Sequence, residues 1–167
     1  PDSVTAERAA RVAISADGRY AAFCSRATPG DLVPGKNVPS GATDTSNVYV
    51  RDLVGSTTQI LTLAATNPSV TSDGACGPDV QITPDGRYVA FRSTATNLLS
   101  GTWSYAAGTP SGWVYDRQTG ERLILSNNHV MANSNNARPG DPILQPGPAD
   151  GGELGPDEAL VYEEVTA

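Results

Sequence analysis

His129 is the only histidine in this 167-residue sequence, and it is the side chain best suited to act as a general base. A serine hydrolase would pair such a base with a serine nucleophile and an orienting carboxylate. Neither a Gly-x-Ser-Gly-Gly run nor a Gly-x-Ser-x-Gly elbow occurs in the sequence. We therefore interpret His129 as an exposed or hydrogen-bonded histidine in an Asn-rich segment, and we expect a protein that is not an enzyme.

Asp31, Asp44 and Asn47 place three oxygen-bearing side chains in one long polar segment. Carboxylate and amide oxygens are the ligands that Ca²⁺ prefers. Their spacing does not match a known calcium-binding loop, so we expect no cofactor and keep a calcium site on these residues as the alternative. Asp17 and Asp85 each precede a glycine, which is typical of a tight turn rather than of a metal site.

Three aromatic residues, Trp103, Tyr105 and Trp113, flank a segment rich in Gly, Ser and Thr. Exposed rings on such a loop could form a platform for a sugar or a peptide. Packing in a core or at a sheet edge is the interpretation we favour, and the binding platform is the alternative.

The composition limits the elements that can position these residues. The 17 Gly and 13 Pro argue against a helical bundle and favour a loop-rich, all-β chain. A net charge of −7 argues against binding to a nucleic-acid backbone, which requires a basic face. No apolar run approaches the roughly 20 residues that a membrane-spanning helix needs, so we expect no membrane span.

An internal repeat is the strongest signal in the sequence. Residues 15–28 align with residues 83–96 at an offset of 68, and nine of these 14 positions are identical. A fixed period of this kind indicates a repeat architecture. We predict a first repeat at 1–68, a second at 69–125, and an acidic extension rich in Pro, Gly and Asn at 126–167.

Each repeat predicts four antiparallel strands. They are 10–14, 19–25, 47–52 and 57–63 in the first repeat, and 79–82, 87–93, 112–116 and 121–125 in the second. An Asp-Gly pair between the first two strands tolerates the positive φ of a tight hairpin. The second strand of each repeat is apolar on both faces, which predicts cover on both sides and makes Phe23 and Phe91 equivalent core residues.

The run Ile-Ser-Ala-Asp-Gly-Arg-Tyr-Ala-Ala-Phe-Cys-Ser (14–25), followed by Asp-Leu-Val-Pro-Gly (31–35) and Asn-Val-Tyr-Val-Arg-Asp-Leu (47–53), resembles TolB-like β-propeller repeats. The resemblance covers about residues 8–125. It implies an all-β fold of two four-stranded antiparallel propeller-type blades with an irregular Pro/Gly-rich C-terminal extension, in a secreted or periplasmic protein. It implies no single function, because such propellers serve both as binding scaffolds and as domains attached to enzymes.

The two cysteines, Cys24 and Cys76, match no metal-binding spacing. In a four-stranded antiparallel blade, the end of the second strand and the entry to the next blade lie on the same side. Cys24 ends a second strand and Cys76 precedes the next blade, so we predict a disulfide that joins the two blades. An even cysteine count with little lysine also favours an extracellular or periplasmic location.

A second resemblance lies in the C-terminal region. Residues 125–132 (Leu-Ser-Asn-Asn-His-Val-Met-Ala), with 140–147 and 150–152, resemble the catalytic-histidine segment of bacterial trypsin-like serine proteases. That resemblance would make His129 the general base, but the family's nucleophile motif is missing from the sequence. Five prolines between 139 and 156 argue against a long helix or a central strand, and a last strand is predicted at 159–165.

Two blades alone bury one interface and leave outer faces and sheet edges open. We therefore predict a non-enzymatic, secreted structural or interaction module that self-associates as a homo-oligomer through open blade edges, as a ring or a filament. A fragment of a trypsin-like serine protease that uses His129 is one alternative. A carbohydrate- or peptide-binding propeller module is the other.

Overall fold

The computed structural model describes residues 12–42, 44, 46–98 and 112–125, together with the backbone of residues 142–143 and 159–160. The regular secondary structure of these residues is almost entirely β-strand, and their one helix, α1 (Pro29–Leu32), has four residues. The prediction of an all-β chain with four-stranded antiparallel sheets is confirmed. The helical structure in this part of the chain does not reach the length and apolarity that crossing a membrane requires.

The first sheet contains β1 (Val12–Ile14), β2 (Tyr20–Ser25), β3 (Asn47–Asp52) and β4 (Thr57–Ile60). Its strands are antiparallel and lie in the order of the sequence. The turn between β1 and β2 is the predicted Asp-Gly turn, in which Gly18 has a φ of 71°. A glycine serves there because a left-handed backbone costs other residues free energy.

The second sheet repeats this arrangement with β7 (Cys76–Ile82), β8 (Tyr88–Ser93), β9 (Gly112–Asp116) and β10 (Arg122–Leu125). The pairing of Val12 with Phe23 recurs as the pairing of Val80 with Phe91, 68 residues further on. The third and fourth strands correspond at an offset of 64, since Tyr20 pairs with Asp52 and Tyr88 pairs with Asp116. The structural repeat therefore has the same register in both sheets.

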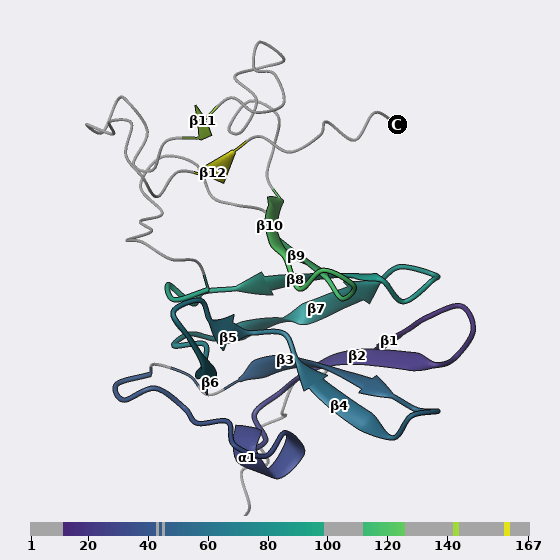
Figure 1. The fold of residues 1–167 in the computed structure, drawn as a ribbon, viewed down its shortest axis with the longest axis horizontal. Helices are drawn as coiled ribbons and strands as arrows, with labels where there is room; N and C mark the ends of the chain where they lie inside the picture. The colour runs from purple at the N-terminus through teal and green to yellow at the C-terminus, as the bar shows by residue number, and fades with distance from the viewer. Residues whose placement is uncertain are drawn as a thin grey trace, which may run out of the picture.

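The two sheets lie one above the other, and their first hairpin turns lie at the same end (Figure 1). The backbone N–H of Ala16 in the first turn donates a hydrogen bond of 2.9 Å to the carbonyl of Pro84 in the second. A short hairpin of β5 (Leu63–Ala64) and β6 (Asn67–Thr71) connects the sheets. Within the described residues neither sheet closes on itself, so the propeller-type geometry stays a prediction.

Near the C-terminus, β11 (Pro142–Ile143) pairs with β12 (Ala159–Leu160). The last strand predicted at 159–165 is present at its first two residues, and the remainder lies outside the described residues. The predicted strand at 57–63 is divided, because β4 ends at Ile60 and β5 begins at Leu63.

The hydrophobic core lies between the two sheets. Alternate side chains of a strand point to opposite faces, and cross-strand neighbours share a face. Each sheet contributes to this core the side chains on the face that is turned toward the other sheet. The buried members of this cluster are Ala22, Val48, Val50, Leu61, Val80, Val89, Phe91, Ala95, Leu98 and Trp113.

Phe23 and Phe91 occupy equivalent register positions, as predicted, but their burial differs. Phe91 is 3 % exposed and belongs to the core between the sheets. Phe23 is half-buried and stacks on Tyr49 with ring centroids 5.7 Å apart. The difference arises because the first sheet packs on this face of the second sheet, whereas among the described residues no sheet packs on the corresponding face of the first.

Candidate functional site

The sequence-predicted catalytic and aromatic residues lie mostly beyond the part of the chain that the structure describes. His129, Trp103 and Tyr105 are outside the described residues. Trp113 lies in β9 opposite Phe91 and is 7 % exposed, within the core between the sheets. Its ring therefore packs as the core residue that the sequence interpretation favoured.

The three candidate calcium ligands have different surroundings. Asp31 is exposed on α1. The carboxylate of Asp44 accepts hydrogen bonds from the guanidinium of Arg26 at 3.1 Å and from the backbone N–H of Ser46 at 2.6 Å. Among the described residues no group of three or more His, Cys, Asp or Glu side chains could hold a metal ion.

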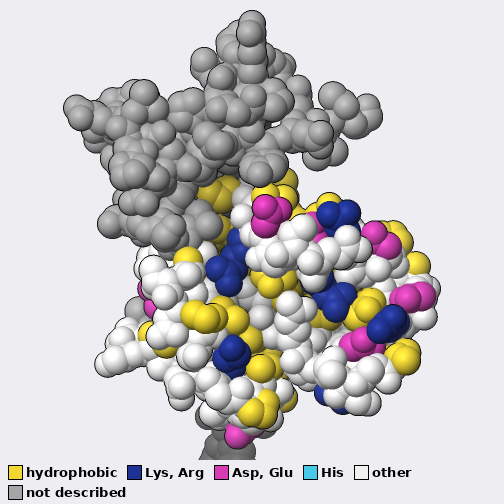
Figure 2. Space-filling view, viewed as in Figure 1, with side chains coloured by type: hydrophobic (Ala, Val, Ile, Leu, Met, Phe, Trp, Pro, Cys, Tyr) yellow, Lys and Arg dark blue, Asp and Glu magenta, His cyan; other side chains and the backbone are white. Residues whose placement is uncertain are grey.

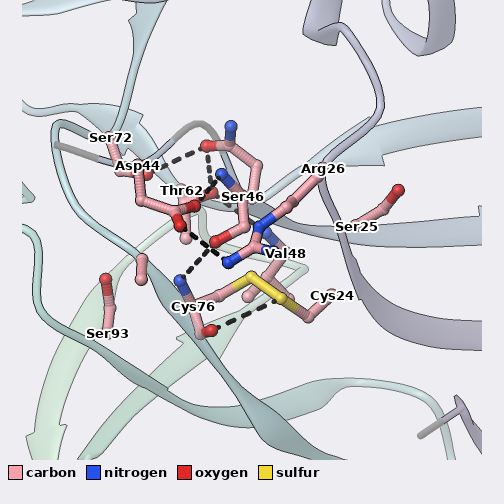
Figure 3. Close-up of a disulfide and its surroundings, with 12 residues drawn as sticks. Cys24, Ser25, Arg26, Asp44, Ser46, Val48, Thr62, Ser72, Cys76 and Ser93 are labelled. Carbon is pink, nitrogen blue, oxygen red and sulfur yellow. Dashed lines mark hydrogen bonds and ion pairs between the residues drawn. A yellow bond between two sulfur atoms is a disulfide. The ribbon is translucent and has the colours of Figure 1, made fainter. Parts of the chain in front are cut away.

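Asn47 lies at the centre of a buried polar network beside the first sheet. Its Oδ1 accepts hydrogen bonds from the hydroxyl of Thr62 at 2.8 Å and from that of Ser72 at 3.0 Å. All three residues are at most 1 % exposed. The network connects the start of β3 with the segments on both sides of the β5–β6 hairpin, so it fixes the path of the chain between the sheets (Figure 3).

Cys24 and Cys76 form the predicted disulfide, with Cα atoms 6.1 Å apart (Figure 3). The bond joins β2 of the first sheet to the first residue of β7 in the second sheet. The hydroxyl of Ser46 also accepts a hydrogen bond of 3.1 Å from the backbone N–H of Cys76. One covalent bond and one hydrogen bond therefore hold the same corner of the interface.

An arginine–aspartate pair recurs in the two sheets and was missed by sequence reasoning. The guanidinium of Arg19 donates to Asp52, with a shortest distance of 2.9 Å, and that of Arg87 donates to Asp116 at 2.7 Å. In each pair both Nε and Nη2 donate. The signal was available, because the arginine of Asp-Gly-Arg and the aspartate that ends the third strand are identical in both repeats.

Each aspartate of these pairs also organises the following turn. Asp52 accepts from the backbone N–H groups of Val54 and Gly55, and Asp116 accepts from those of Gln118 and Thr119. The hydrogen bonds from Arg19 and Arg87 are the largest cause that lowers the pKa of each aspartate, to about 2 in both cases. Both carboxylates are therefore ionised at neutral pH and hold the hairpin ends together. Figure 2 shows positive and negative side chains side by side at this end of the molecule.

The contact between the two turn regions centres on Tyr20. The guanidinium of Arg117 stacks on the Tyr20 ring, 3.9 Å from its centroid. Gly86 packs so closely that an added Cβ would lie 2.4 Å from a ring carbon of Tyr20. Arg117 also donates a hydrogen bond of 2.6 Å to the carbonyl of Gly86. Tyr20 of the first sheet therefore packs against Gly86 and Arg117 of the second.

The face of the first sheet that is turned away from the second sheet carries exposed apolar side chains. Val12 is 56 % exposed and Ile14 is 58 % exposed, whereas their repeat equivalents are buried (Val80, 2 %) and half-buried (Ile82). On the same face, Tyr49 and Ile60 are buried. The open area is therefore confined to β1 and the adjoining part of β2, and a surface of this type is suited to protein–protein contact.

Comparison with protein-family models, with curated proteins and with solved structures finds no match for this chain. The resemblances to TolB-like repeats and to a protease segment therefore stay predictions from the sequence. The internal repeat itself is a structural finding, because the two sheets share strand order, register and turn contacts.

Proposed function

We propose that this chain is a non-enzymatic, secreted interaction module of propeller type that associates with further copies of itself. The observation that carries the proposal is the exposure of Val12 and Ile14 on an edge strand, at positions whose repeat equivalents Val80 and Ile82 pack against another sheet. Exposed apolar side chains beside unpaired strand edges favour association with another polypeptide.

The strand order of the sheets adds support. β1 and β4 are the outer strands of the first sheet, and β7 and β10 are the outer strands of the second. An outer strand presents backbone N–H and C=O groups that a strand of another chain can pair with. Pairing at such edges is the route of self-association that the sequence predicts.

A structural role is also consistent with the charged groups. The two aspartates with pKa values of about 2, Asp52 and Asp116, pair with arginines and cap hairpin turns. Their environment stabilises the ionised form, which suits a fixed ion pair rather than a proton donor at neutral pH.

An oxidising location is consistent with the Cys24–Cys76 disulfide, since disulfides persist in extracellular and periplasmic compartments. The bond also supports a structural role, because it joins the two sheets covalently.

The test is the oligomeric state of the oxidised full chain. Sedimentation velocity over a wide concentration range, with electron microscopy of the same samples, should reveal species larger than one chain. Deletion of residues 153–167 separates the two predicted routes, because loss of assembly would assign it to the C-terminal extension. A chain that sediments as a stable monomer at every concentration would overturn the proposal.

A further inference from the structure

Because the two sheets are repeats, each residue at the contact between them has an equivalent residue in the other sheet. On the second sheet, the face in contact with the first carries Val80 and Phe91 in adjacent strands. Their equivalents on the first sheet are Val12 and Phe23. The chain therefore has two copies of this face, one that is covered by a sheet and one that is open along β1.

The turn regions show the same relation. Gly86 and Arg117 of the second sheet contact the ring of Tyr20. Their equivalents are Gly18, where an added Cβ would meet nothing within 4 Å among the described residues, and Leu53, which is 53 % exposed. Gly18 has the same positive φ as Gly86 (71° and 73°), so its backbone has the shape that accepts a tyrosine ring in the second sheet. We call Val12, Ile14, Gly18 and Leu53 the β1 surface.

The face of the first sheet that packs against the second sheet also has an equivalent, which lies on the second sheet. On the first sheet, the face covered by the second sheet includes Tyr20, Ala22, Val50 and Leu61. At the equivalent positions of the second sheet the residues are identical in type, namely Tyr88, Ala90, Val114 and Leu125. Leu61 is completely buried, whereas Leu125 is 49 % exposed. We call these four residues of the second sheet the β8 surface.

The two surfaces differ from the internal interface at a few positions. Arg92 stands where the first sheet has Cys24, and Gly112 stands where it has Val48. The disulfide of the internal interface is therefore not repeated in the β8 surface. Without a disulfide, an interface built from these surfaces would be non-covalent and therefore reversible, unlike the internal one.

From these equivalences we propose that the β1 surface binds the β8 surface of another copy of this chain, in the face-to-face arrangement that joins the two sheets within the chain. The inference rests on the proposed self-association and specifies packing of sheet faces in place of pairing of strand edges. Because the two surfaces are different, the contact is head-to-tail, and successive copies form a ring or a filament according to whether the rotation closes.

The first experiment compares exposed apolar residues inside and outside the β1 surface. The double variant Val12→Thr/Ile14→Thr keeps residues that favour strands and should weaken self-association about tenfold or more, because two apolar side chains lose their burial. Val54 is 76 % exposed but lies at the equivalent of Gln118, which is exposed in the second sheet. Val54→Thr is therefore the matched control, and it should leave association unchanged.

Thermal unfolding of the dilute variants tests that the monomers remain folded. Because Val12 and Ile14 are exposed in the single chain, both variants should melt close to the wild-type chain. Unchanged association of a folded Val12→Thr/Ile14→Thr variant would overturn the inference.

The second experiment locates the contact without weakening it. A photoreactive benzoylphenylalanine in place of Tyr88 should form a covalent dimer on irradiation, with the bond in a peptide that contains Gly18 or Leu53 of the other copy. Dimers cross-linked only elsewhere would overturn the face-to-face contact and leave self-association intact. A chain that never associates would overturn both proposals.

Discussion

At the scale of the residue, two side-chain pairs define the ends of the sheets. Arg19 with Asp52, and Arg87 with Asp116, join the start of a second strand to the end of a third strand in each repeat. Each aspartate accepts further hydrogen bonds from the next turn, so one carboxylate organises both the sheet end and the hairpin. The aspartates Asp17 and Asp85 have the turn role predicted for them, since each accepts from the backbone N–H two residues later.

The ion pair of Arg87 with Asp116 predicts a loss of stability in acid. The pKa of Asp116 is about 2 in the folded chain, below the ordinary aspartate value of 3.8, mainly because of its hydrogen bond with Arg87. A carboxyl whose pKa is lowered by folding stabilises the folded state above its unfolded pKa, and that stabilisation is lost as the pH falls through the folded value. Urea unfolding of the wild-type chain and Asp116→Asn should therefore differ at neutral pH and converge as the pH falls from about 4 to about 2.

The control for this prediction is Arg87→Gln, which removes the donor and keeps the carboxyl. In that variant, the titration of Asp116 followed by NMR should move up toward the ordinary range of an aspartate pKa. An unchanged midpoint would show that Arg87 does not control the ionisation of Asp116.

The left-handed backbone of Ser56 predicts that a glycine at this position would stabilise the chain. The turn from Asp52 to Ser56 matches the turn from Asp116 to Gly120, although Gly55 suggests from the sequence a turn one residue shorter. The left-handed position is occupied by Ser56 (φ 53°) in the first repeat and by Gly120 (φ 81°) in the second. Ser56→Gly should raise the free energy of unfolding by about 0.5–1 kcal/mol in urea titrations, since glycine adopts this backbone without steric cost. Gly120→Ser should lower it, and equal stability of all three chains would contradict the assignment.

At the scale of the element, burial distinguishes two sheets that have the same register. The second strands β2 and β8 pair with equivalent strands in the same register, but β8 packs its Phe91 face on another sheet while the corresponding face of β2 is only partly covered. The polar network around Asn47 and the β5–β6 hairpin set the position of the second sheet relative to the first.

Alanine substitutions of Phe23 and Phe91 measure the energetic effect of this difference in burial. Phe91→Ala should cost about 3–5 kcal/mol of unfolding free energy, as expected for a buried phenylalanine. Phe23→Ala should cost clearly less, because Phe23 is half-buried and packs mainly on Tyr49. Paired urea or thermal unfolding curves make the comparison, and equal losses would mean that Phe23 is as fully packed as Phe91 in solution.

At the scale of the whole molecule, a disulfide, an apolar interface and hydrogen bonds between the sheets hold the described sheets together. The Cys24–Cys76 disulfide spans a sequence separation of 52 residues and connects the sheets at one corner. The Tyr20 contact with Gly86 and Arg117 connects them at the turn end. Besides the Asn47 network and the β5–β6 hairpin, these two separated contacts therefore hold the sheets in their relative position.

Loss of the disulfide should lower stability without abolishing the sheets. In the chain-entropy description, closure of a loop of this length contributes about 4 kcal/mol. The double variant Cys24→Ser/Cys76→Ser should lose an amount of this order in urea unfolding, and wild-type chain unfolded in reductant should match it. Stability that does not respond to reductant would show that non-covalent contacts alone set the position of the sheets.

The sequence by itself determined the repeat, the strands and the hairpin turns, because these depend on local periodicity and on Asp-Gly chemistry that recurs at a fixed offset. It also predicted the disulfide, since antiparallel order places Cys24 and Cys76 at one corner. Only the tertiary structure decided which copy of each repeated position is buried. Val12 and Val80 are the same residue in the same register, yet one is 56 % exposed and the other 2 %. The physical reason is that burial depends on what packs against a face, and local sequence pattern does not contain that information.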